Sequence, residues 1–139
     1  MHNVRYKQRF QNYDNSFLLL KASIMIEKPS IIEEAGVIQF FELPFELSWK
    51  LLKDYCEFLG FTVNSPREAI KRALSIAMIS NGEIWLRTLM DRNLTVHVYD
   101  EAIAHKVSMG NEVYETIKDE YFPLLEQLYK KFKDELCLD

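Results

Sequence analysis

Apolar residues recur along most of this 139-residue chain at alternating steps of three and four, which is the period of one face of an α-helix. The first such stripe predicts an N-terminal helix that ends near Lys28 and Pro29. Its members are Tyr6, Phe10, Tyr13, Phe17, Leu20 and Ile24.

A second helix is predicted to begin at Ser30, because Ser30 and Glu33 have the spacing of a helix capping box. It carries apolar residues on several faces, which is typical of a central helix. Pro44 lies inside it and should kink or split it, since proline removes a backbone donor. Gly60 is expected at its C-terminal end. Its main stripe is Ile31, Ala35, Ile38, Phe45, Trp49, Leu52, Cys56 and Leu59.

The second half of the chain predicts three more helices. The segment 65–68, Ser-Pro-Arg-Glu, has the residues of a helix start. The helix after it should turn Ile70, Leu74, Ala77 and Met78 inward, and a short helix with Ile84, Trp85, Leu89 and Met90 should follow the break at 80–83. The last long helix, which Asp100 can cap, has a stripe made of Tyr114, Ile117, Tyr121, Leu124, Leu128 and Phe132.

Neither strand alternation nor an internal repeat or linker interrupts this pattern. The chain is therefore predicted to be a single domain over residues 1–139, an all-α bundle of about five helices. Hydrophobic residues make up 48% and charged residues 27%, as in an ordinary globular protein. The densest apolar run, 36–61, is interrupted by charged residues that include Glu42, Glu46, Lys50, Lys53 and Asp54, which argues against a membrane span. The polar N-terminus and the two cysteines without motif spacing lead us to expect a cytoplasmic protein with reduced thiols.

Chemistry is concentrated in residues 91–101, DRNLTVHVYDE, where Arg92, His97 and Tyr99 have the spacing R-x-x-x-x-H-x-Y. On one continuous helix Arg92 and His97 would lie roughly 140° apart and could not meet. Poor helix formers between them, followed by a capping residue at Asp100, favour a break. A break would let both side chains face one pocket.

An Arg–His pair suits phosphate chemistry that needs no metal. A guanidinium holds phosphate oxygens, and an imidazole can take a proton from an RNA 2′-hydroxyl or return one to the leaving oxygen. A full acid–base cycle needs two proton-transferring groups, and the motif has one histidine in each chain. A two-fold dimer could bring two such histidines together. The spacing also fits a helix corner without chemistry. His97 and His105 lack a third ligand, so we expect no metal site.

Five segments spread over the chain carry a resemblance to a known family. They are RYKQRFQNYDNSFLLL, FELSWKLLKDYCEFLG, SPREAIKRAL, NGEIWLRTLMDRNLTVHVYDE and YFPLLEQLYKKFK. In this order they resemble the nucleotidyltransferase substrate-binding proteins, a branch of the HEPN superfamily that includes the HepT toxins. Pro44 departs from what is typical of the central helix in that family.

The resemblance implies an up-and-down bundle, commonly a homodimer, whose partner is a separately encoded minimal nucleotidyltransferase of the MNT type. ATP and Mg are expected on that partner, and no cofactor on this chain. In the HepT branch the motif is the active centre of a metal-independent endoribonuclease, which assigns catalysis to Arg92 and His97. The partner silences it by transferring AMP to the motif tyrosine, here Tyr99. Asp91 and Asn93 flank the motif as supporting candidates.

Two functions therefore follow from the sequence. The first is a HepT-like toxin, an endoribonuclease held inactive by its partner in a toxin–antitoxin pair. The alternative is a non-catalytic substrate-binding subunit of a two-component nucleotidyltransferase. The intact motif favours the toxin. The net charge of −4 favours the binding subunit, because an acidic protein repels RNA at long range.

Overall fold

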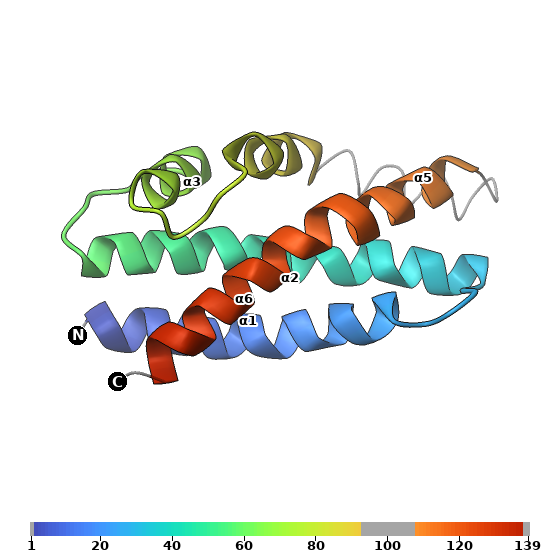
Figure 1. Cartoon of the computed structure of the whole chain (residues 1–139), viewed down its shortest axis with the longest axis horizontal. Helices are drawn as coiled ribbons and strands as arrows, with labels where there is room; N and C mark the ends of the chain where they lie inside the picture. The colour runs from blue at the N-terminus through green and yellow to red at the C-terminus, as the bar shows by residue number, and fades with distance from the viewer. Residues whose placement is uncertain (1, 93–107, 138–139) are drawn as a thin grey trace.

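The computed structural model describes residues 2–92 and 108–137, and every regular element within them is a helix (Figure 1). The elements in chain order are α1 (His2–Ile24), α2 (Ile31–Phe58), α3 (Pro66–Ser75), a helical segment at 82–92, α5 (Ser108–Thr116), the π-helical turn η1 (Ile117–Tyr121) and α6 (Phe122–Cys137). We call α5, η1 and α6 together the C-terminal arm, since they follow one another without a break. With the arm counted as one helix, the described residues form the predicted all-α bundle of about five helices.

The bundle is built on a long antiparallel hairpin of α1 and α2, and the C-terminal arm lies diagonally across it (Figure 1). The arm contacts α2 along α5 and η1, and α6 contacts α1. α3 also packs on α2. None of the described helices is both long and apolar enough to cross a membrane.

The apolar stripe of α1 forms one wall of the core, as predicted, since all six of its members are buried. It meets α6 through stacked rings and a hydrogen bond. The Phe17 ring stacks on that of Tyr129, with the centroids 4.5 Å apart, and the Tyr13 hydroxyl donates to the Leu125 carbonyl at 2.6 Å. α1 itself ends at Ile24, one turn earlier than the position of Pro29 predicts.

The predicted ends of α2 are confirmed. The Ser30 hydroxyl accepts the Glu33 N–H at 3.1 Å, and the Glu33 carboxylate accepts the Ser30 N–H at 2.9 Å, which completes the capping box. At the other end Gly60 has φ 100° and donates to the Glu57 carbonyl, while Phe61 N–H donates to the Cys56 carbonyl. This is the glycine-ended motif that satisfies the last carbonyls of a helix.

Pro44 does not split α2, which continues from Ile31 to Phe58 as one helix. Proline removes a single backbone hydrogen bond, at a cost of about 3 kcal/mol in a helix interior. Packing on both sides of it holds the helix together. Phe41 and Phe45 are each 1% exposed, and the Phe41 ring stacks on Tyr121 of the C-terminal arm with centroids 5.6 Å apart.

α3 starts as predicted but turns a different face inward. The Ser65 hydroxyl caps the Glu68 N–H at 3.1 Å. Ile70 is buried, whereas the prediction for Leu74 is wrong because its side chain is 44% exposed. The buried face consists of Ala69, Ile70 and Ala73, and Leu74 lies beside it, covering the start of the next helix at Gly82.

The segment 82–92 buries Trp85, which is 1% exposed, and Thr88, which is 2% exposed. Met90, in the same helical segment, is 74% exposed. Five residues after Trp85, Met90 lies about 140° around the helix from it and faces solvent.

The C-terminal arm buries all six residues of its predicted stripe. The π turn η1 was not predicted. Pro123 follows it closely and cannot donate to the carbonyl four residues earlier, and its ring crowds that carbonyl. The wider turn, in which the Phe122 N–H donates to the Ile117 carbonyl, accommodates the proline without ending the helix.

The end of α3 has a left-handed residue that is not glycine. Ala77 has φ 61°, and its N–H donates to the Leu74 carbonyl at 3.1 Å while Met78 N–H donates to the Ala73 carbonyl at 2.9 Å. This position of a helix end usually holds glycine, because a Cβ makes the left-handed conformation unfavourable by about 1–2 kcal/mol.

We therefore expect Ala77→Gly to stabilise the protein by about 1 kcal/mol, because it removes this strain. The free energy of unfolding in urea measures the effect. The control is Ala69→Gly inside α3, which should destabilise by about 1 kcal/mol or more through helix propensity and lost packing. A destabilising Ala77→Gly would contradict the assignment of strain to Ala77.

Candidate functional site

The structure describes the first two residues of the predicted motif region, Asp91 and Arg92, at the end of the segment 82–92. Asn93, His97 and Tyr99 lie outside the described residues. The convergence of Arg92 with His97, and the break between them, therefore stay predictions. The described part shows how the base of the motif is held.

Arg92 forms an ion pair with α2. Its Nη1 lies 2.5 Å from Oε1 of Glu46. The other oxygen of that carboxylate, Oε2, accepts a hydrogen bond from the Trp49 indole N–H at 3.0 Å. Glu46 is thus oriented by a residue one turn further along α2 while it holds the guanidinium. The Arg92 side chain remains 32% exposed and that of Glu46 37%, so water and solutes reach the pair.

Asp91 binds the C-terminal arm. The hydroxyl of Tyr121, in η1, donates to Oδ2 of Asp91 at 2.9 Å. Burial raises the pKa of Tyr121 to about 12, with the hydrogen bond to the Asp91 carboxylate acting in the same direction. Tyr121 is therefore a protonated donor across the neutral range, and Asp91 is held as its acceptor.

Arg87, one turn before Asp91, reinforces the same contact. Its guanidinium lies 5.9 Å from the centroid of the Tyr121 ring and forms an ion pair with Glu120. Both residues it contacts belong to the π turn. One face of the segment 82–92 is thus bound to η1 and its last residue to α2, so two separate elements orient the start of the motif.

Comparison with known proteins shows the family to which this chain belongs. The family model described as "Nucleotidyltransferase substrate binding protein like" matches residues 8–134. The chain belongs to this family. A crystal structure of a protein from Thermus thermophilus is similar, with a TM-score of 0.72 and 29% sequence identity over 86% of this chain and 97% of that one. Among curated proteins no sequence matches.

In this member of the family the Arg92 guanidinium is paired with the Glu46 carboxylate. Reasoning from the sequence missed Glu46, Trp49 and Tyr121 as parts of the site. Trp49 was predicted to be core, but it is half-buried and orients Glu46. A signal for Glu46 existed, because a carboxylate in a helix that is apolar on several faces needs a partner. Nothing in the sequence identifies that partner as Arg92, 46 residues away.

No group of three His, Cys, Asp or Glu side chains within residues 2–92 and 108–137 is placed to hold a metal ion. His97 and His105 lie outside those ranges. The described site offers instead the partly exposed guanidinium of Arg92, a group that binds phosphate or carboxylate oxygens.

The contact between Tyr121 and Asp91 makes stability depend on alkaline pH. An unfolded tyrosine ionises near pH 10, whereas folded Tyr121 ionises near 12, so between these values the unfolded state binds fewer protons. Folding stability is fully present below pH 10 and falls as pH rises towards 12. We expect Tyr121→Phe to lose about 1 kcal/mol at neutral pH and to flatten this alkaline fall.

Urea unfolding at a series of alkaline pH values measures both effects. A fall in stability remains in the variant, because burial also raises the pKa of Tyr55 to about 12. An alkaline slope identical in the wild type and in Tyr121→Phe would show that the Tyr121 proton is not linked to folding.

Proposed function

We propose that this chain is the binding subunit of a two-component nucleotidyltransferase, in which a separately encoded enzyme of the MNT type supplies the site for ATP and Mg. The observation that carries the proposal is the family match over residues 8–134, which covers nearly the whole fold. The net charge of −4 agrees with a protein partner better than with an extended grip on nucleic acid.

The end of the segment 82–92 is the surface we assign to that partner. Arg92 is exposed enough there to pair with an incoming anion, and Tyr99 follows seven residues later in the sequence. If Tyr99 faces the same pocket as Arg92, as the motif spacing predicts, an AMP group on Tyr99 would bring a negative phosphate to that guanidinium, which is a favourable pairing. The proposal therefore includes Tyr99 as the acceptor of AMP.

The test uses the small nucleotidyltransferase whose gene is expected beside this one. Mixed with the chain, it should form a complex that elutes as one species in size-exclusion chromatography with light scattering. With ATP and Mg, mass spectrometry should find one AMP on Tyr99. Tyr99→Phe is the matched control, expected to abolish modification and leave the complex intact. Failure of the two proteins to associate would refute the subunit assignment, and AMP on Tyr99→Phe would refute Tyr99 as its site.

A second candidate function is a HepT-like toxin, and the exposure of the Arg92–Glu46 pair favours it. An ion pair exposed to this degree contributes about 0–1 kcal/mol, so an RNA phosphate can displace Glu46 from Arg92. In this role Arg92 would stabilise the charge that grows on the phosphate. His97 of one copy would take the proton of the attacking 2′-hydroxyl, and His97 of a second copy would give a proton to the leaving oxygen.

The toxin candidate needs two histidines, and α2 carries a surface that would supply the second in a homodimer. Leu43 is 58% exposed and lies three residues before Glu46, about 60° from it around the helix, and Phe40, 43% exposed, lies three residues before Leu43. Exposed apolar side chains that lie together mark association surfaces. A two-fold contact through this side of α2 would bring two copies of the Arg92–Glu46 pair near each other.

If the chain is a toxin, its inducible expression should arrest growth, and Arg92→Ala or His97→Ala should restore it. Glu46→Gln should raise RNA cleavage by the purified chain up to about fivefold, because it frees the Arg92 guanidinium from a pair of about 1 kcal/mol at most. Glu83→Gln, at the exposed start of the same helical segment, is the control and should change nothing.

The readouts are colony growth after induction and cleavage of a fluorescently labelled RNA. Circular dichroism checks that each variant is folded. A folded His97→Ala protein that arrests growth as strongly as the wild type would exclude the ribonuclease role and leave the binding subunit as the function.

A further inference from the structure

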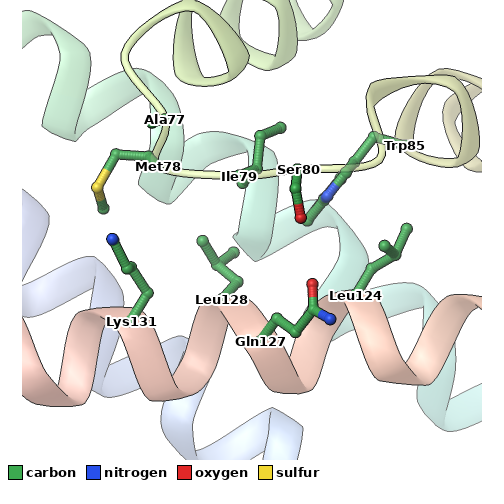
Figure 2. Close-up of a pocket in the computed structure, with 9 residues that line it drawn as sticks. All are labelled: Ala77, Met78, Ile79, Ser80, Trp85, Leu124, Gln127, Leu128 and Lys131. Atoms are coloured by element: carbon green, nitrogen blue, oxygen red, sulfur yellow. The ribbon is translucent and has the colours of Figure 1, made fainter.

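A cavity of about 260 Å³ lies between the loop after α3 and the helix α6, at the end of the segment 82–92 that is remote from Arg92 (Figure 2). One wall is the loop 77–80 together with Trp85, and the other is one face of α6. The residues that line it are Ala77, Met78, Ile79, Ser80, Trp85, Leu124, Gln127, Leu128 and Lys131.

Trp85 provides an unused hydrogen-bond donor in this cavity. The residue is 1% exposed, and within the described part of the chain no group accepts its indole N–H. Figure 2 shows the ring reaching from its helix towards Ser80, with the amide of Gln127 facing it from α6. Its nitrogen is not among the buried polar atoms that lack a partner in the described residues, so this N–H opens into the space of the cavity and is free to donate there. A ligand acceptor in the cavity would satisfy it.

Lys131 gives the cavity a positive charge at its other end, beside Met78 (Figure 2). No carboxylate of the described residues pairs with its ammonium group. Between the two polar ends the walls are apolar, made by Ile79, Leu124 and Leu128. This combination of apolar walls with a few convergent polar groups is typical of sites for small organic molecules.

The loop wall is held in an unusual backbone conformation. Ala77 and Asn81, the residues at its two ends, have φ values of 61° and 58°. Asparagine adopts the left-handed region readily, whereas for alanine it costs about 1 kcal/mol or more, and such strain gathers at ligand-binding segments. Met78 and Ile79 in this loop are each 8% exposed, and Ser80 lies between Ile79 and Trp85 (Figure 2).

We propose that this cavity binds a small organic anion, with a planar ring between the apolar walls, a hydrogen-bond acceptor on the Trp85 N–H and the negative group at Lys131. The volume lies just below the range of about 300–1,000 Å³ that is usual for drug-sized ligands, so a single ring with one charged group fits best. Trp85 and Arg92 are seven residues apart, about 10 Å along the helix axis, so the cavity is distinct from the motif. The proposal does not rest on the function proposed above.

Isothermal titration calorimetry on the full chain tests the site with two probes. Uridine 5′-monophosphate offers a phosphate and 4-hydroxybenzoate a carboxylate as the anionic group. At least one should bind saturably with a stoichiometry of one for each chain, and the probe that binds more tightly identifies which group the site prefers. Lys131→Met should weaken that binding about tenfold or more, because it removes a charge-assisted contact.

Two further variants make the result specific. Trp85→Phe keeps an aromatic ring and removes the N–H, and it should weaken binding several-fold. Because Trp85 is 1% exposed, the smaller ring also costs stability, so circular dichroism checks that the variant is folded under the conditions of the titration. Lys130→Met removes an exposed charge next to Lys131 that does not line the cavity, and binding should be unchanged. The proposal is overturned if neither probe binds up to millimolar concentration, if Lys131→Met binds like the wild type, or if Lys130→Met weakens binding as much as Lys131→Met.

Discussion

The aromatic contact between α1 and α6 is the interaction on which the rest of the structure depends. Phe10 and Phe17 of α1 stack on Phe132 and Tyr129 of α6, with ring centroids 6.0 and 4.5 Å apart, and the Tyr13 hydroxyl adds a buried hydrogen bond to the backbone of α6. Each aromatic pair contributes about 0.5–1.5 kcal/mol beyond the area it buries. Because these partners come from opposite ends of the chain, their contact closes the bundle and sets the path of the C-terminal arm across the hairpin.

That path determines how the motif begins. The arm carries η1 over α2, where Phe41 stacks on Tyr121, and Tyr121 in turn holds Asp91. From the other side, Glu46 of α2 holds Arg92. The last turn of the segment 82–92 is therefore oriented by two elements that are themselves fixed by the core. A local change in η1 or in α2 would reach the motif without touching any motif residue.

The segment 82–92 serves two regions of different chemistry. Its last turn presents a guanidinium whose ion pair is exposed enough to exchange for an external anion. Its first turn buries Trp85 and turns an indole N–H into a cavity shared with α6. The same helix packs on the arm between them through Arg87 and Tyr121. The cavity wall at Trp85 and the ion pair at Arg92 thus belong to one short helical segment.

The sequence by itself determined the five helices, their buried stripes on α1 and the arm, the caps at Ser30, Ser65 and Gly60, and the family. The helices, stripes and caps follow from the spacing of apolar residues and from capping residues, which act within a few positions of the chain. The family follows from the five sequence segments that resemble it and from their order. The sequence also identified Arg92, but tertiary structure decided that Glu46 holds it while Trp49 orients Glu46, that Tyr121 holds Asp91, and that Leu74 and Met90 face outward. The π turn before Pro123 likewise depended on how the arm packs. Periodicity states which side of a helix is apolar, whereas only the arrangement of several helices determines which polar side chains come within hydrogen-bonding distance.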